Sequence, residues 1–353
     1  MDPEFLDTPA ALTAFLDGLG NCDGQPPRFY MDLEGNNLSR AGTLSLVTIL
    51  LEPEGTVHLV DVTTLGQQAF TTAGRDGRTL QGILESRDII KVFFDIRNDS
   101  DALFSLHGIR VAGIEDLQLM ELASRSFAKR NINGLAKCIE RDSTISLEER
   151  RTWRAVKDQG KRLFDPQQGG TYAVFDRRPL SKEVKDYCTQ DVSLMPHLWD
   201  KYRGKLCDAW WQKIETETSA RIRLSQSPAF VGKGQHMALG PPDWLSWHPS
   251  PAERMARSRV QSAASRKTVS ATRAASSSHE SIATRSEESD DLIRMMGRVA
   301  LTDTGRDLDT DSNEGDLTDE LGQNRGSDDC DSGDSGDLSA CGKECGYCGC
   351  CEH

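Results

Sequence analysis

The sequence Arg28-Phe29-Tyr30-Met31-Asp32-Leu33-Glu34-Gly35 decides the fold that this chain is expected to adopt. Its apolar lead-in is typical of a central β-strand, and two acids, Asp32 and Glu34, stand at the end of it. Because side chains two residues apart on a strand point to the same face of a sheet, we expect both carboxylates on one side. Taken by itself the pattern also fits a polar strand end. Asp2-Pro3-Glu4 repeats it, with no strand expected there.

The segments that follow this strand predict a mixed α/β sheet covered by helices. Apolar runs bounded by turn residues predict five strands, at 28–35, 44–51, 57–62, 89–94 and 110–117, and the first three form an antiparallel meander. Apolar residues at helical spacing predict helices at 8–19, 79–86, 98–106, 119–127, 133–139, 146–159, 182–202 and 206–224. This order fits a ribonuclease-H-like topology, with a mixed five-stranded sheet flanked by helices.

The composition of the 353-residue chain changes near residue 250. Beyond that point the chain is rich in Ser, Arg, Asp and Gly and has few large side chains. Such a segment buries too little apolar surface to offset the entropy of ordering it. We therefore expect five regions: an N-terminal helix (1–24), one folded domain (25–225), a Trp- and Pro-containing arm (226–250), a disordered Ser/Arg-rich and then acidic linker (251–338), and a Cys-rich tail (339–353).

The net charge of −13 arises in the linker rather than in the folded part. Residues 287–338 carry 17 acidic and 4 basic side chains, whereas residues 1–250 have a net charge of only −4. The acidic total therefore does not exclude a nucleic-acid substrate, although it argues against strong non-specific binding of duplex. No signal-peptide pattern and no apolar run of membrane-spanning length are present, which predicts an intracellular protein, in either the nucleus or the cytoplasm.

The cysteines are concentrated at the C-terminal end, where six of the ten lie between Cys330 and Cys351. The others show no disulfide framework, which suits a reducing compartment. Thiols at two- to four-residue spacing suit Zn²⁺, and the candidate ligands are Cys341, Cys345, Cys348, Cys350 and Cys351. Because this segment lacks the second well-spaced ligand pair of a zinc ribbon or finger, reduced or acylated cysteines are the favoured alternative.

A second candidate acid, Asp99, follows the buried strand expected at 89–94. We expect Asp99 at the start of a helix, one turn before Leu103, which packs inward. Two alternatives stay open. Asn98, Asp99 and Ser100 are all good helix-capping residues, and Asp101 is a second choice for a catalytic acid.

A third candidate station is the pair Tyr187 and Asp191, four residues apart on the helix expected at 182–202. This spacing places the phenol and the carboxylate on one helix face, with Cβ atoms about 5–6 Å apart. A surface Tyr–Asp pair would show the same spacing. Tyr172 and Asp176 repeat it in a strand-like or loop stretch, and we interpret that copy as a decoy.

Four acids in this order suit the two-metal hydrolysis of a phosphodiester. The reaction needs an attacking hydroxide and stabilisation of the leaving alkoxide, and two divalent ions about 3.5–4 Å apart supply both. Mg²⁺ and Mn²⁺ prefer carboxylate oxygens, and without cations the clustered acids would repel one another. Each motif is weak alone, but the three occur in order, each on an element that would aim its acid at one point.

With these motifs the chain resembles the DEDDy group of 3′–5′ exonucleases, the ribonuclease D and Werner-type exonuclease family. It is most similar to the Egalitarian-like branch seen in many fungal proteins. The resemblance covers about residues 25–205. Besides the acids, it includes Phe94 to Leu103, Arg178-Pro179-Leu180 and Tyr187 to Leu194.

This resemblance implies that four acids hold two Mg²⁺ or Mn²⁺ ions and that Tyr187 orients the attacking water; the acids are Asp32, Glu34, Asp99 and Asp191. It also implies release of nucleoside monophosphates from the 3′ end of single-stranded RNA or DNA. Arg178 would contact a substrate phosphate or form a structural salt bridge. Asp95 departs from the pattern, because ribonuclease D relatives often have His there. Asp95 would alter the metal preference or point away.

Two further readings of the chain stay open. One is a catalytically silent exonuclease-fold adaptor that binds RNA or protein. The other is a scaffold whose acidic, Cys-rich tail carries the function while the domain is vestigial; the protein partners of the tail are unknown. All four acids and the tyrosine are present, which favours the active enzyme. The aromatic segment Leu239 to Trp247 is expected to pack back on the domain, because exposed Trp pairs are unusual; a partner-docking motif is the alternative.

Overall fold

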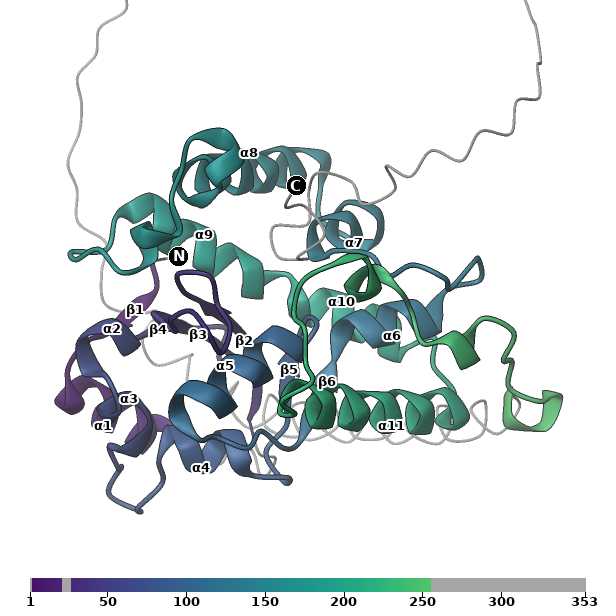
Figure 1. Ribbon diagram of the computed structural model, residues 1–353, viewed down its shortest axis with the longest axis horizontal. Coiled ribbons are helices and arrows are strands. Elements are labelled where there is room, and N and C mark those ends of the chain that lie inside the picture. The colour runs from purple at the N-terminus through teal and green to yellow at the C-terminus, as the bar shows by residue number, and fades with distance from the viewer. Residues whose placement is uncertain (1, 21–26, 255–353) are drawn as a thin grey trace, which may run out of the picture. The chain divides into compact units, whose positions relative to one another are not determined.

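The computed structural model describes residues 2–20 and 27–254, and it is built around a mixed six-stranded sheet in the order β1-β4-β3-β2-β5-β6 (Figure 1). The strands are β1 (Glu4–Leu6), β2 (Arg28–Glu34), β3 (Leu46–Glu52), β4 (Val57–Asp61), β5 (Lys91–Phe93) and β6 (Ile114–Asp116). Strands β2, β3 and β4 form the predicted antiparallel meander, and β5 and β6 continue the sheet in parallel with β2. The predicted ribonuclease-H-like α/β fold is confirmed.

The sheet has one strand more than the sequence predicted. Strand β1 pairs in parallel with β4, with Glu4 opposite His58 and Leu6 opposite Val60. The expectation of five strands was therefore wrong, as was the view that Asp2-Pro3-Glu4 has no strand beside it. Three residues are too few to show alternation, and this strand depends on a partner far along the chain.

The helices fall close to their predicted positions. Their bounds are α1 (Pro9–Gly18), α2 (Val62–Leu65), α3 (Gln68–Thr71), α4 (Leu80–Glu85), α5 (Arg97–His107), α6 (Leu117–Ser124), α7 (Leu135–Asp142), α8 (Leu147–Phe164), α9 (Lys182–Ser193), α10 (Met195–Arg203) and α11 (Asp208–Ser225). The single helix predicted at 182–202 is two helices, because Pro196 has no N–H to continue the hydrogen-bond ladder past Leu194. The short helices α2 and α3 were not predicted.

Strand β2 divides the core of the described chain into two sides. Phe29, Met31 and Leu33 pack into the cluster that includes residues of α1, α3, α4 and α5. Tyr30 points the other way, into the cluster formed with α6, α10 and α11. Because alternate residues share a face, Asp32 and Glu34 lie on the side of Tyr30. Helix α9 packs against β2 and β3, and so the sheet and α9 together enclose the acids.

The arm after α11 folds back onto the domain, as predicted. The Trp244 side chain is buried and meets Trp210 of α11 edge to face, with ring centroids 5.2 Å apart. Trp247 packs against the same ring at 4.4 Å. The arm backbone also pairs with the loop before α7, since the amide of Gly240 donates to the carbonyl of Arg130 at 2.7 Å.

Several expectations concern the cysteines and the C-terminal region. Cys138, Cys188 and Cys207 are buried and free, and Cys22 lies outside the described residues. Within residues 2–20 and 27–254, no helix has the length and apolar character needed to cross a bilayer. The predicted linker beyond residue 254 and the candidate zinc ligands of the tail lie outside the described residues; those ligands are Cys341, Cys345, Cys348, Cys350 and Cys351.

Candidate active site

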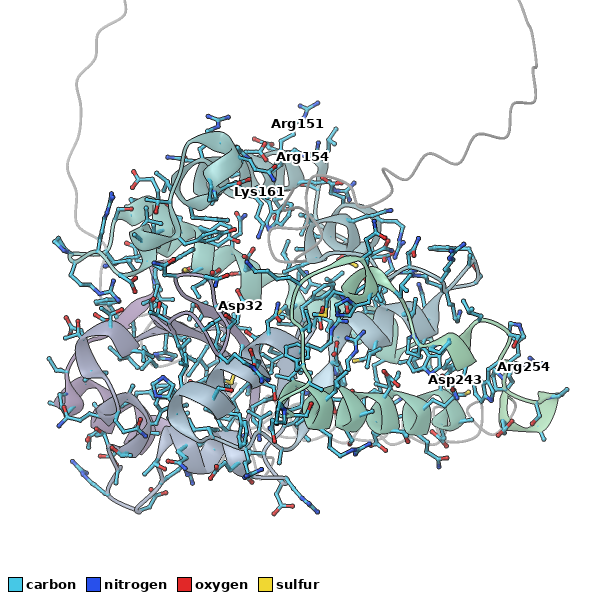
Figure 2. All side chains as sticks on the ribbon, viewed as in Figure 1. Asp32, Arg151, Arg154, Lys161, Asp243 and Arg254 are labelled. Atoms are coloured by element: carbon cyan, nitrogen blue, oxygen red, sulfur yellow. The ribbon has the colours of Figure 1, made fainter. Side chains whose placement is uncertain are left out.

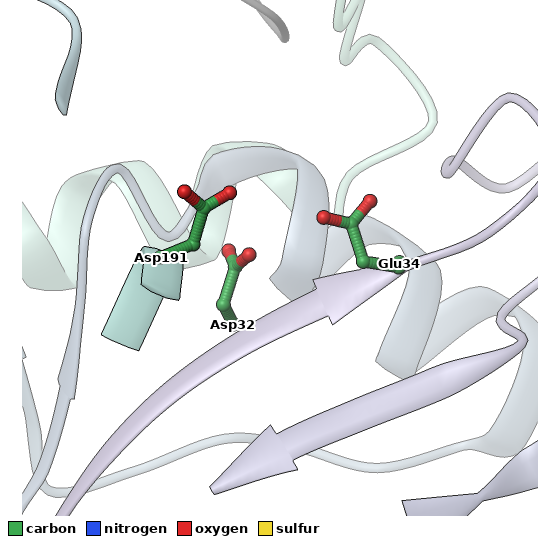
Figure 3. A group of neighbouring side chains, drawn as sticks. All are labelled: Asp32, Glu34 and Asp191. Atoms are coloured by element: carbon green, nitrogen blue, oxygen red, sulfur yellow. The ribbon is translucent and has the colours of Figure 1, made fainter. Parts of the chain in front are cut away.

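Three carboxylates meet where β2 ends beside α9. Asp32, Glu34 and Asp191 each offer an oxygen, and these oxygens all lie within 4.8 Å of one another. Figure 3 shows the three carboxylates on the same side of β2, with Asp191 coming from the helix. Glu34 and Asp191 are buried and Asp32 is half-buried. We call these three residues the acid cluster.

Helix α9 aims Tyr187 and Asp191 at the strand because of its cap and its apolar face. The Ser181 hydroxyl accepts a hydrogen bond from the amide of Val184 and so caps the first turn. Buried residues of α9, among them Val184 and Cys188, fix the side of the helix that faces the sheet. Tyr187 and Asp191 lie on that buried side, at the predicted spacing of one turn.

Asp99 flanks the acid cluster from the first turn of α5. It is not among the three acids whose oxygens lie within 4.8 Å of one another, but it is buried and close enough to interact electrostatically. Burial and the charge of Asp32 raise the pKa of Asp99 well above its usual range. Helix α5 begins after Ile96 and has no side-chain capping bond, so the capping alternative is not observed.

Asp101, the second choice for this acid, is held by another residue. The Arg40 guanidinium donates from Nε to Oδ1 of Asp101 at 2.7 Å, and the Arg40 amide donates to Oδ2 at 2.9 Å. The same guanidinium also donates to the carbonyls of Ser225 and Ser227. Asp101 therefore anchors the segment after α11, which favours Asp99 as the acid of the site.

The surroundings of the acid cluster disfavour the ionised form of two of its carboxylates, Asp32 and Glu34. Burial, and next the charge of Asp191, raise the pKa of Asp32 to about 7. Burial and the charge of Asp32 raise the pKa of Glu34 well above its usual range. One oxygen of Glu34, Oε2, is buried and has no hydrogen-bond partner. Three close carboxylates, one of them with an unpartnered oxygen, suit Mg²⁺ or Mn²⁺, so the residues present fit the expected ions.

Lys157 of α8 is the functional candidate that sequence reasoning missed. Its Nζ donates to both Asp191 oxygens at 2.7 Å and to the Tyr187 hydroxyl at 3.1 Å. A signal was present, because Lys157 shares a helix face with Trp153, Gly160 and Phe164, all of them buried. A lysine in the middle of an inward face is unusual unless it has a partner.

A second group of acids, the half-buried Asp95 and the buried Asp116, lies beside the first and differs from it in its partners. Asp95 accepts from Nε of Arg97 at 2.6 Å and from Nη1 of Arg221 at 3.4 Å. Asp116 accepts from the same Nη1 of Arg221 at 2.8 Å. Burial raises the pKa of Asp95, but the charges of Arg97 and Arg221 outweigh it and lower the pKa to about 2. We call these four residues the paired acid group. Their contacts favour the alternative that Asp95 points away from the metals.

The remaining predicted residues have structural contacts. Arg178 pairs with Asp61 at the end of β4, through Nε at 2.6 Å, and its Nη1 donates to the Phe175 carbonyl at 2.8 Å. These contacts favour the salt-bridge alternative for Arg178 over a phosphate contact. In the decoy pair, Tyr172 begins the 3₁₀ turn Tyr172–Phe175, and Asp176 follows its end and accepts from the Ser45 hydroxyl at 2.5 Å.

The chain belongs to the 3′–5′ exonuclease family, because the family model described as 3′-5′ exonuclease matches residues 3–206. Two solved structures of Trypanosoma brucei RNase D have a similar fold. The GMP complex is 23% identical over 69% of this chain and 70% of that chain, with a TM-score of 0.53. The complex with RNA U12 is 22% identical over 69% and 77%, with a TM-score of 0.54. No curated protein sequence matches this chain.

Proposed function

We propose that the chain is an active exonuclease that removes nucleotides one at a time from the 3′ end of single-stranded RNA or DNA. The products would be nucleoside monophosphates. The observation that carries this proposal is the acid cluster: three carboxylates within 4.8 Å of one another, one with a buried oxygen that has no partner. Membership of the 3′–5′ exonuclease family supports the reaction type.

The acid cluster and Asp99 would hold two Mg²⁺ or Mn²⁺ ions. When bound, such ions supply a hydroxide nucleophile and stabilise the leaving alkoxide. The chain itself would supply orientation. Burial and the charge of Asp191 raise the pKa of the Tyr187 phenol well above its usual range, so the hydroxyl stays protonated. A protonated phenol can hydrogen-bond to the attacking water and direct it towards the terminal phosphodiester.

The proposed substrate and family branch rest on the similar structures and on the sequence motifs. One T. brucei RNase D structure contains RNA U12, and another contains GMP, which is itself a nucleoside monophosphate. Placement in the Egalitarian-like branch rests on the quoted sequence motifs. We propose residues 25–225 as the exonuclease domain. The family match begins earlier, at residue 3, and so also includes β1 and α1.

Incubation of the purified protein with 5′-labelled RNA and DNA oligonucleotides tests this function. We expect a ladder that shortens from the 3′ end in Mg²⁺ or Mn²⁺ and full-length oligonucleotide in EDTA. Asp32→Asn should abolish the ladder. Asp186→Asn is the matched control, because Asp186 lies on α9 but is only half-buried and pairs with the exposed Lys182. Full-length oligonucleotide that stays bound to the protein in both metals would support the silent adaptor instead.

A further inference from the structure

Lys157 reaches from α8 into the acid cluster with all its donors occupied. An ammonium group has three N–H bonds, and Nζ of Lys157 has three oxygen partners: both oxygens of Asp191 and the hydroxyl of Tyr187. The side chain is buried. Figure 2 labels three other basic residues of α8, Arg151, Arg154 and Lys161, in the part of the view above Asp32.

The surface of α8 is shaped to receive the Tyr187 ring. A Cβ placed on Gly160 would lie 2.4 Å from Cδ2 of Tyr187, so a side chain there would displace the ring. Phe164, one turn further on, meets the ring edge to face at 5.0 Å between centroids. Because Lys157, Gly160 and Phe164 share one helix face, the same packing places both the ring and the ammonium group.

These contacts determine the direction of the Tyr187 hydroxyl. Lys157 has no acceptor, so in this contact the phenol oxygen must accept the hydrogen bond. The phenol hydrogen is then directed away from Lys157 and is available to another acceptor. Without the ammonium group, the phenol could donate to the neighbouring Asp191 carboxylate instead, and would lose that direction.

We propose that Lys157 is a positioning residue of the exonuclease reaction. It fixes the direction of the Tyr187 O–H bond and holds the Asp191 carboxylate, and it competes with divalent cations for the oxygens of Asp191. This inference rests on the proposed function for its kinetic part. The competition for Asp191 does not depend on catalysis and can be measured by itself.

The first test compares Lys157→Met with the wild type by calorimetric titration with Mn²⁺ alone. Removing a charged competitor from Asp191 should tighten Mn²⁺ binding about tenfold. Lys182→Met is the matched control, because Lys182 is an exposed lysine on α9 that pairs with Asp186. Unchanged or weaker Mn²⁺ binding by Lys157→Met would overturn the competition. If Lys157→Met does not fold, Lys157→Gln, which is neutral and keeps N–H donors, carries the same comparison.

The second test measures kcat and KM on a labelled oligonucleotide at saturating Mn²⁺. Lys157→Met should lower kcat by about tenfold or more, with little change in KM, because the substrate itself is not contacted. In a Tyr187→Phe background the same substitution should lower kcat by less than it does in the wild type, because the part of its effect that acts through the phenol is already lost. Independent losses that multiply, or an unchanged kcat in Lys157→Met, would overturn the positioning role. A wild type without nuclease activity would defeat the proposed function but leave the Mn²⁺ comparison interpretable.

Discussion

Two groups of buried and half-buried carboxylates lie side by side in this protein, and they differ in the cations that face them. In the paired acid group, Asp95 and Asp116 are matched by the guanidinium groups of Arg97 and Arg221. In the acid cluster, by contrast, the ammonium group of Lys157 pairs with Asp191, one of three neighbouring carboxylates.

The pKa values show what this difference means physically. The arginines lower the pKa of Asp95 to about 2 despite its burial. In the acid cluster, burial and like charges raise the pKa of Asp32 to about 7. Buried acids that are matched by cations stabilise a fold. Close acids without matched cations are unfavourable in the protein alone, and they are best explained by divalent cations that complete the site.

The largest expected effect is the loss of activity in Glu34→Gln. Removing one carboxylate ligand should lower kcat/KM by more than about 10³-fold, because metal stabilisation of the transition state amounts to several kcal/mol. The free energy of unfolding without metal should not fall, because the substitution removes a repelled charge whose Oε2 has no partner. Nuclease assays and urea unfolding in EDTA measure the two quantities. Retained activity, or a clear loss of stability, would contradict the assignment of Glu34 as a metal ligand.

Arg221→Met should have the opposite effect to Glu34→Gln, with a loss of stability and little change in activity. Arg221 is buried and pairs with Asp116, which is fully buried. Leaving that carboxylate without its partner should lower the free energy of unfolding by about 3–5 kcal/mol. At a temperature where the variant remains folded, its kcat should stay within a few-fold of the wild type. Urea unfolding followed by circular dichroism provides the check, and a stability equal to the wild type would contradict the assignment.

Lowering the pH is expected to have a smaller effect, on the contribution of Asp95 to the free energy of unfolding. Because the pKa of Asp95 is lowered to about 2 from an ordinary 3.8, its ionised form stabilises the fold above pH 4, and this contribution is lost as pH falls towards 2. The contribution is about 2 kcal/mol. The stability difference between wild type and Asp95→Asn should therefore shrink between pH 5 and about pH 2.5. A difference that is constant over this range would show that Asp95 is not held by the arginines.

The sequence predicted those parts of the site that depend on local spacing. Asp32 and Glu34 are two apart on a strand, and Tyr187 and Asp191 are four apart on a helix, so each pair follows from the geometry of one element. The strand at 28–34 could be predicted because its seven residues include an apolar run before the acids.

Features that depend on distant partners were not predictable in the same way. Asp99 and Asp101 could not be separated by their spacing, since the choice depends on Arg40, which lies 61 residues away in the chain. Lys157 reaches Asp191 across 34 residues. Strand β1 has three residues and is recognised by its pairing with β4. Each of these features depends on a tertiary contact, and the periodicity of a single helix or strand does not indicate such contacts.

The most direct test of the central claim is anomalous diffraction from crystals of the protein soaked in Mn²⁺. The expected result is two anomalous peaks about 3.5–4 Å apart, bounded by Asp32, Glu34, Asp99 and Asp191, and no peak at Asp95 and Asp116. Crystals that show no Mn²⁺ between the four acids, or Mn²⁺ beside the arginine-paired carboxylates instead, would contradict the account.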